Sequence, residues 1–160
     1  MMFPGPDWKP VSPFPFALAR KSFTGPSTDE AIVSLRYFQK PDGTLAAVAS
    51  FGPLSEGAPG QVHGGMILTV LDEALGAAAW LSGRPVLTVR LTTDFRRRVP
   101  INTEMLVTAR VTRLRHRLVF VEGALFGGDE KRYAGAQGEF LELSEAAQKE
   151  LFGRALRRSM

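Results

Sequence analysis

Two glycines and an acidic residue lie at a spacing that could support chemistry on a carbonyl group. The segment from Ala58 to Gly76 reads APGQVHGGMILTVLDEALG. If its apolar part is a helix, Gly65 stands at the helix start, where unpaired backbone N–H groups favour a developing oxyanion. Asp72 lies inside the apolar run and could activate water as a general base or attack as a nucleophile. The segment therefore predicts a site for acyl transfer.

The spacing of Gly65 and Asp72 predicts a site shared by two subunits. The two residues are seven positions apart, which places them on one helix face about 10 Å apart along the axis. A carbonyl held at Gly65 is too far from Asp72 of the same helix for direct attack. The carboxylate of a second, antiparallel copy could reach it, so we expect a twofold dimer with the site at its interface.

The carboxylates of Asp72 and Glu73 also allow a simpler interpretation. Burial of an ionised carboxylate without good partners costs several kcal/mol, so an acid in an apolar helix usually has a structural or functional reason. The alternative is that both side chains face solvent on a helix that is less buried than its composition indicates. The helix pattern alone leaves the two interpretations open.

The surrounding sequence predicts an α+β domain. Hydrophobic spacing favours a helix over Gly64–Leu81 that is apolar around nearly its whole circumference, which is typical of a buried helix. Strand patterns occupy residues 31–40, 44–51, 86–99, 105–114, 117–126 and 132–143. We expect these strands to form a curved antiparallel sheet wrapped around the helix.

The predicted strand at residues 86–99 alternates between two faces. The pattern puts Leu87, Val89, Leu91 and Phe95 on one face, and Thr88, Arg90, Thr92, Asp94 and Arg96 on the other. The outward row is only partly polar, so a second subunit could cover part of it.

The two ends of the chain differ from this domain. Residues 1–27 are rich in proline, which predicts an irregular arm draped over the domain. Ser144 is a natural N-cap, and residues 144–160 predict a basic, exposed C-terminal helix. The expected organisation is an arm at 1–27, one domain at 28–143 and a helix at 144–160.

Composition narrows the classes of protein and site. The 160 residues fit one compact domain, and the absence of cysteine excludes disulfides and thiolate metal ligands. Only two histidines are present, so we expect no metal site. Neither a signal peptide nor an apolar run of about 18 residues is evident, which favours a cytoplasmic protein without a membrane span. The charge excess of 20 − 16 = 4 suits an anionic ligand, and no nucleic-acid-binding motif accompanies it.

The segment EGAPGQVHGGMILTVLDEALG resembles the hallmark of hotdog-fold acyl-CoA thioesterases, in the branch that contains the phenylacetate-pathway and thioesterase-superfamily enzymes. The likeness continues through VLTVRLTTDFRRRVP, RVTRL and VFVEGALF, and it covers roughly residues 30–143. It implies a hotdog fold and the hydrolysis of an acyl-CoA thioester to a free acid and CoA, without a cofactor.

The resemblance implies a role for each residue that matches the hallmark. Asp72 matches the helical acid, which acts as general base or nucleophile. Gly65, with Gly64 beside it, matches the backbone N–H that polarises the thioester carbonyl. His63 matches a histidine that orients the site, and Thr88 matches a residue that helps to hold the water. In such dimers the acid and the glycine come from different subunits.

The resemblance also implies substrate contacts. The acyl chain would enter a slot between two helices, lined by residues such as Met66, Leu68 and Leu75. The coenzyme phosphates would lie near basic residues, because arginine binds phosphate through a bidentate fork. The candidates are Arg96, Arg97 and Arg117, with Arg98, Arg113 and Arg115 close to them in the sequence. A solvated basic edge is the alternative for these arginines.

Two other functions stay open beside hydrolysis. One is a non-catalytic module that binds or senses acyl-CoA, and the other is a dehydratase of the same fold. The expected partners are an acyl-CoA substrate and a second copy of the chain, as a homodimer or a dimer of dimers, with no nucleic acid and no membrane.

Overall fold

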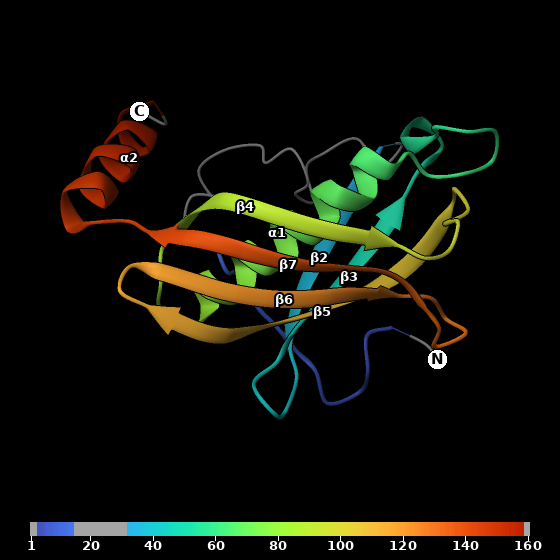
Figure 1. Ribbon diagram of the computed structural model, residues 1–160, viewed down its shortest axis with the longest axis horizontal. Coiled ribbons are helices and arrows are strands. Elements are labelled where there is room, and N and C mark those ends of the chain that lie inside the picture. Colours follow the sequence, from blue (N-terminus) through green and yellow to red (C-terminus); the bar gives the residue numbers. More distant parts are fainter. Residues whose placement is uncertain (1–2, 15–31, 159–160) are drawn as a thin grey trace.

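The computed structural model describes residues 3–14 and 32–158 (Figure 1). The predicted arm at 15–27 and the predicted start of the domain at 28–31 lie outside the described residues. The elements in chain order are β1 (Lys9–Pro10), β2 (Val33–Gln39), β3 (Leu45–Phe51), a 3-10 turn (Pro53–Ser55), α1 (Gly64–Leu81), β4 (Val86–Phe95), β5 (Thr103–Arg115), β6 (Leu118–Phe126), β7 (Arg132–Glu142) and α2 (Glu145–Arg158).

The strands form one antiparallel sheet in the order β1-β2-β3-β5-β6-β7-β4. Figure 1 shows α1 running across one face of this sheet, which we call the inner face, while α2 projects from one end. The chain leaves β3, forms α1 and β4, and returns to pair β5 with β3, so β4 becomes an edge strand on the far side. The predicted α+β architecture, a curved sheet around one central helix, is confirmed.

The bounds of α1 agree with the predicted helix, and local chemistry explains both ends. His63 has the extended backbone of an N-cap (φ −61°, ψ 135°), and its side chain accepts a hydrogen bond from the Gly65 N–H. Ser82 caps the C-terminus, and Gly83 follows with a φ of 84°, a conformation that glycine adopts without strain. Helix α1 also has the length and hydropathy of a membrane span, but it serves as the core helix of the sheet.

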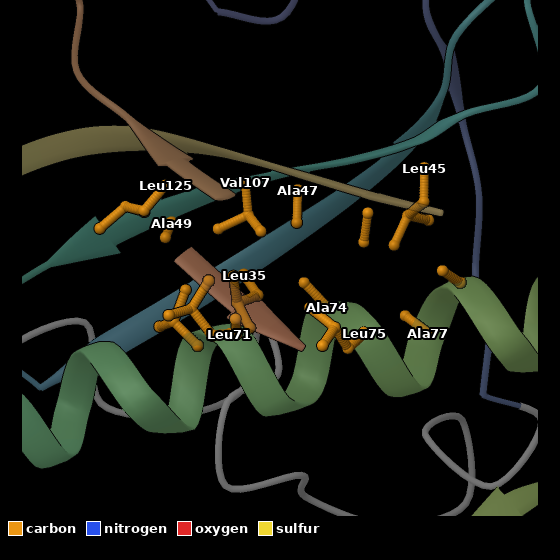
Figure 2. Packing of buried hydrophobic residues seen from close by; sticks show 14 of the residues in the cluster. Leu35, Leu45, Ala47, Ala49, Leu71, Ala74, Leu75, Ala77, Val107 and Leu125 are labelled. Carbon is orange, nitrogen blue, oxygen red and sulfur yellow. The ribbon is translucent and has the colours of Figure 1, made fainter. Parts of the chain in front are cut away.

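The core lies between α1 and the inner face of the sheet. Figure 2 shows Leu71, Ala74 and Leu75 of α1 pointing toward the side chains of β2, β3 and β5, such as Leu35 and Val107. All five are fully or almost fully buried. The predicted place of Leu75 in a substrate slot is therefore wrong: its side chain is 0% exposed and belongs to the core.

Two glycines let Leu75 approach the sheet closely. A Cβ at Gly123 of β6 would lie 2.6 Å from Leu75 Cδ1 and 2.8 Å from the Thr108 carbonyl oxygen. A Cβ at Gly138 of β7 would lie 3.1 Å from Leu75 Cδ2. The missing side chains therefore form the hollow that receives Leu75 and set the distance between α1 and β6.

Replacing Leu75 with alanine should lower the free energy of unfolding by about 2–5 kcal/mol, since it leaves a cavity in a close-packed core. Replacing Gly123 with alanine should cost about 1–3 kcal/mol, because the new methyl group overlaps Leu75. In the Leu75→Ala background the Gly123→Ala cost should shrink, since the overlapping methyl group of Leu75 is gone. Urea unfolding of the two single variants and the double variant measures this coupling, and strictly additive costs would contradict it.

A β-bulge changes the face on which the first residues of β4 lie. Thr88 pairs with Phe140 of β7, and Arg90 pairs with the preceding residue Glu139, so Val89 is an extra residue on β4. Phe140 is 1% exposed and faces the core, and residues directly opposite each other share a face. Thr88 therefore lies on the inner face, toward α1.

The predicted alternation of β4 is wrong at this bulge. Beyond it, Leu91 pairs with Gly138 and Phe95 with Ala134, so both lie on the inner face together with Thr88. Leu87 pairs with Leu141 on the outer face. The sequence pattern could not show this, because a single extra residue reverses the side-chain alternation without changing the composition of the strand.

Residues 3–14 are the described part of the predicted N-terminal arm, and they lie against the domain. Strand β1 pairs with β2, and Phe3 and Trp8 pack over a small apolar cluster on the outer face that includes Val48 and Leu106. Phe14 reaches the other side of the sheet, where its ring lies 5.9 Å from Tyr37. The outer face of β2, β3 and β5 is thus covered by the first residues of the chain.

The predicted C-terminal helix is present as α2. Ser144 caps it, since its Oγ accepts a hydrogen bond from the Ala147 N–H at 3.2 Å. Phe152 of α2 lies 5.8 Å from the ring of Trp80, which in turn lies 6.1 Å from Phe14. Trp80, near the C-terminal end of α1, thus contacts both the N-terminal segment 3–14 and α2. Residues 159–160 lie outside the described residues.

Candidate active site

At the start of α1, the backbone N–H of Gly65 is hydrogen-bonded and that of Gly64 is not. His63 Nδ1 accepts the Gly65 N–H at 2.9 Å, which requires Nδ1 to be unprotonated and places the ring proton of a neutral imidazole on Nε2. The N–H of Gly64 has no hydrogen-bond partner among the described residues. Gly64 is exposed and lies at the positive end of the helix dipole. An oxyanion would therefore find its free backbone donor at Gly64.

The loop before α1 fixes the position of His63. The His63 N–H donates to the Ser55 carbonyl at 2.8 Å, and the neighbouring Val62 N–H donates to the Val99 carbonyl at 2.8 Å. Gly57 packs directly against His63, because a Cβ at residue 57 would lie 2.9 Å from His63 Cα. The histidine therefore occupies one position at the helix start and keeps its cap on Gly65.

Asp72 is hydrogen-bonded to β4. Thr88 Oγ1 donates to Asp72 Oδ1 at 2.8 Å, a contact that depends on the inward orientation given by the bulge. Asp72 and Glu73 are both half-buried, so neither the fully buried nor the fully solvated interpretation of the two carboxylates applies. The structure thus brings together the acid and the threonine that the sequence singled out, and it leaves Asp72 accessible to a ligand.

Replacing Thr88 with valine should lower kcat about 10-fold, because it removes the donor that orients the Asp72 carboxylate and keeps the shape of the side chain. Thr88→Ser retains the hydroxyl and should stay close to the wild type. Thr92→Val, the same change on the outward side of β4, is the matched control. Steady-state kinetics on all three variants test the role, and equal losses in Thr88→Val and Thr88→Ser would contradict it.

One chain does not bring Asp72 and the helix start together. Gly64 and Asp72 are eight residues apart on a regular helix, which corresponds to about 12 Å along its axis. The two groups share the exposed side of α1 with Leu68, which is 38% exposed, and Met66 is half-buried beside them. The structure therefore shows the predicted distance between the helix start and Asp72 within one chain.

The ring of Phe95, a residue that no sequence motif marks as part of the site, lies beside the helix start. A Cβ at Gly64 would lie 3.8 Å from Phe95 Cζ and 3.9 Å from Cε1. The side chain is 54% exposed although it is large and apolar. The sequence does hold an indication of this residue: an aromatic side chain stands at the end of the strand that follows the helix and runs back along it.

The basic residues after β4 are not equivalent. Arg96 Nε donates to Asp94 Oδ2 at 2.7 Å, and this bond, with the nearby charge of Arg132, holds the pKa of Asp94 below its ordinary value. Arg97 and Arg98 are exposed and have no carboxylate partner within the described ranges 3–14 and 32–158. The backbone bond between Val62 and Val99 keeps these two arginines close to the start of α1.

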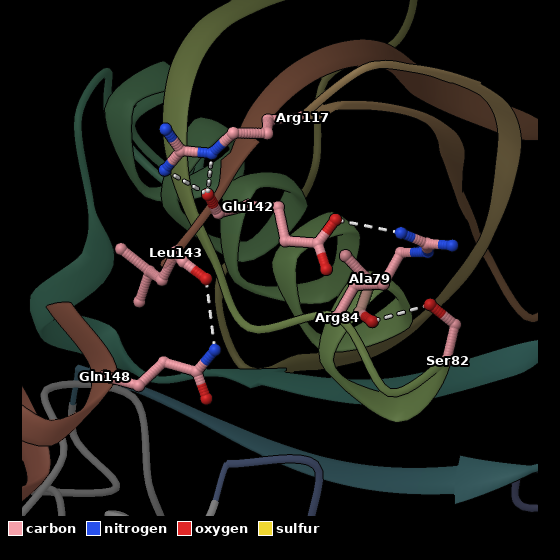
Figure 3. A network of polar contacts seen from close by, with 7 residues as sticks. All are labelled: Ala79, Ser82, Arg84, Arg117, Glu142, Leu143 and Gln148. Atoms are coloured by element: carbon pink, nitrogen blue, oxygen red, sulfur yellow. Dashed lines mark hydrogen bonds and ion pairs between the residues drawn. The ribbon is translucent and has the colours of Figure 1, made fainter. Parts of the chain in front are cut away.

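Arg117 lies at the other end of the molecule. Figure 3 shows its guanidinium donating to the Glu142 carbonyl, at 2.8 Å from Nη2, near the turn that follows α1. The carboxylate of Glu142 binds Arg84 at 2.8 Å in the same network. A single chain therefore does not bring Arg117 together with Arg96 and Arg97. Of the other two basic residues, Arg113 lies 4.0 Å from the centre of the Phe120 ring and Arg115 is exposed.

The described part of the chain holds no group of three or more histidine, aspartate or glutamate side chains that could bind a metal ion. The chemistry available on the exposed side of α1 is therefore a carboxylate with a hydroxyl partner, a backbone N–H and the apolar groups between them. This set suits acid–base or nucleophilic work on a carbonyl compound.

Comparison with known proteins shows which family and which solved structures the chain resembles. A family model described as "Thioesterase superfamily" matches residues 59–134. The Bos taurus protein named acyl-coenzyme A thioesterase THEM4 is 34% identical over 93 residues, which are 58% of this chain and 38% of that protein. The Xenopus laevis protein of the same name is 29% identical over 59% of this chain and 42% of its own length. The chain thus spans less than half of the length of these two curated relatives.

Solved structures share the fold at low sequence identity. The E. coli PaaI protein from the phenylacetic acid degradation operon has a TM-score of 0.62 at 16% identity, over 70% of this chain and 80% of that chain. The protein smu.793 of Streptococcus mutans, solved with acetyl CoA, has a TM-score of 0.62 at 15% identity, over 90% and 93% of the two chains. The common architecture shows that the chain has the hotdog fold, and residues 59–134, slightly less than half of the chain, match the thioesterase-superfamily model.

Proposed function

We propose that this protein hydrolyses an acyl-CoA thioester to a free acid and CoA. The observation that carries the proposal is the hydrogen-bonded pair of Asp72 and Thr88 on the same side of α1 as the unengaged Gly64 N–H. The names of the curated relatives support this activity, and the S. mutans structure with acetyl CoA supports the ligand.

The reaction needs a donor for the carbonyl oxygen and a base for the water. We assign the donor to the Gly64 N–H, one residue before the glycine that the sequence indicated, because the Gly65 N–H already binds His63. Asp72 takes a proton from water, whose oxygen adds to the carbonyl carbon. The carbon–sulfur bond then breaks, and CoA leaves with the proton. Direct attack by Asp72, followed by hydrolysis of the resulting anhydride, gives the same products.

The proposal requires a second copy of the chain. Strand β4 is the edge of the sheet nearest to the exposed side of α1, and it carries Leu87 and Val89 with 55% and 58% of their surfaces exposed. Exposed apolar side chains on an edge strand favour pairing with another strand. An antiparallel twofold pairing along β4 would place Asp72 of one subunit opposite Gly64 of the partner subunit and complete the site.

The same pairing would gather the arginines. In a single chain Arg97 and Arg117 lie at opposite ends of the molecule. An antiparallel partner reverses the direction of β4, so the partner's Arg117 would approach Arg97 and Arg98. We propose that these residues bind the phosphates of CoA, since arginine suits phosphate in geometry and charge. Arg96 takes part less, because Asp94 already binds it.

Release of free thiol from acyl-CoA esters of different chain lengths tests the proposed function. We expect multiple turnovers without added metal or cofactor. A protein that binds acyl-CoA for hours without releasing thiol would instead be a binding or sensing module, and release of an enoyl product from a hydroxyacyl-CoA would indicate a dehydratase. Either result would overturn the proposal of hydrolysis.

A further inference from the structure

Phe95 is a large apolar side chain that a single chain leaves largely exposed. It is 54% exposed, and within the described part of the chain its ring pairs with no other aromatic ring. It pairs with Ala134 on the inner face of the sheet, so it faces the side of α1. A Cβ at Gly64, the residue with the free amide, would lie 3.8 Å from the Cζ of this ring.

The backbone holds the ring in this place. The N–H groups of Arg96 and Arg97, the two residues after Phe95, both donate to the Tyr133 carbonyl, at 2.8 and 3.1 Å. Because Gly64 has no side chain, nothing separates the ring from the helix start. A carbonyl oxygen bound to the Gly64 N–H would therefore lie near the Phe95 ring.

The surroundings of the ring are apolar. Neighbouring residues on a strand point to opposite faces, and Asp94 and Arg96 pair with each other away from the inner face. On the helix the next exposed side chain on the same face as Gly64 is Leu68, one turn further along. Phe95 and Leu68 are thus two exposed apolar side chains near the free amide. Apolar side chains suit a hydrocarbon chain better than the polar pantetheine arm, which carries two amides and a hydroxyl.

We propose that Phe95 is the apolar wall of the acyl-binding site and that it favours acyl groups with an extended apolar body over acetyl. This inference rests on the proposed function, because it places the acyl group by the carbonyl at Gly64. A contact with the chain beyond the carbonyl stabilises long acyl groups and leaves the two-carbon acyl group almost untouched. Phe95 thus acts on substrate choice through contact with the substrate.

The experiment compares two substrates that differ only in the acyl chain. For Phe95→Ala we expect kcat/KM for octanoyl-CoA to fall about 10- to 100-fold, while kcat/KM for acetyl-CoA changes less than about 3-fold. Phe95→Leu restores part of the apolar contact and should recover part of the loss. Leu141→Ala is the matched control, because Leu141 is an exposed leucine on the outer face, and it should leave the ratio of the two substrates unchanged.

A second measurement separates this inference from the proposed hydrolysis. Calorimetry with the octyl and ethyl thioethers of CoA, which contain no thioester bond, measures chain-length preference without turnover. Loss of the octyl preference in Phe95→Ala supports the inference even if the wild type releases no thiol. An active wild type whose Phe95→Ala variant loses both substrates equally would overturn the inference and leave hydrolysis intact. A variant that becomes monomeric in light scattering would also overturn it, since the ring would then be a subunit contact.

Discussion

Replacing Asp72 with asparagine should lower kcat for acyl-CoA hydrolysis by about 10²- to 10⁴-fold, the usual range for losing a general base. The amide keeps the size of the side chain and one oxygen that can accept the Thr88 hydroxyl at the present distance of 2.8 Å. The fold and the hydrogen bond should therefore survive, while the capacity to take a proton or form an anhydride is lost. Thiol release under saturating substrate measures the effect.

The matched control for this substitution is Glu73→Gln. Glu73 is the neighbouring acid on α1 and is also half-buried, so the change removes the same charge one position away. We expect a much smaller loss from it. If Asp72→Asn and Glu73→Gln had equal kcat values, the reaction would not depend on the Asp72 carboxylate, and the assignment would be wrong.

Replacing Gly64 with proline should lower kcat by about 10²- to 10³-fold, because proline removes the one backbone N–H that we assign to the carbonyl oxygen. Proline is well tolerated at the first position of a helix. His63 already has the extended backbone that a residue before proline adopts, with φ −61° and ψ 135°. The substitution should therefore delete a hydrogen-bond donor while the helix keeps its start.

Gly64→Ala is the control that keeps the N–H. Its Cβ would meet Phe95 at 3.8 Å, an ordinary van der Waals distance, so we expect activity near that of the wild type. Comparable losses in the proline and alanine variants would show that bulk at residue 64, rather than the missing donor, causes the effect. Thermal unfolding of both variants tells a loss of activity from a loss of structure.

Mixing the two inactive variants tests whether the site is shared. In a mixed dimer of Asp72→Asn and Gly64→Pro chains, one site carries both changes and the other carries neither. Random exchange of subunits should then restore about a quarter of the wild-type activity, because half of the dimers are mixed and half of their sites are intact. If both groups acted within one chain, mixing would restore nothing.

Much of the fold follows from local features of the sequence. The helix over Gly64–Leu81 was predicted with its observed bounds, because its apolar residues keep helical spacing and residues 82–85 (SGRP) stop it. The strand segments were predicted within a few residues, since apolar residues and turns mark them. The family resemblance singled out Asp72 and Thr88 separately, and the structure adds the hydrogen bond between them.

The rest depends on distances that a sequence pattern does not contain. Leu75 has the same helical spacing as its neighbours, and only the two glycines opposite it show that it enters the core. The positions of Arg96 and Arg117 at opposite ends of one chain come from the order of the strands. Phe95 approaches Gly64 because β4 runs back along α1, which no spacing within either element reveals.

The extra residue in β4 is the one place in this strand where a change in length is harmless to the facing of the side chains. Deleting Val89 would leave Thr88 and Leu91 two positions apart on a regular strand, so both would still face α1. A single-residue insertion or deletion between Leu91 and Phe95 would instead turn one of these two side chains away from the inner face, and it should be selected against during evolution. Changes in length are better tolerated at turns such as Asp129–Glu130, which lie outside β4.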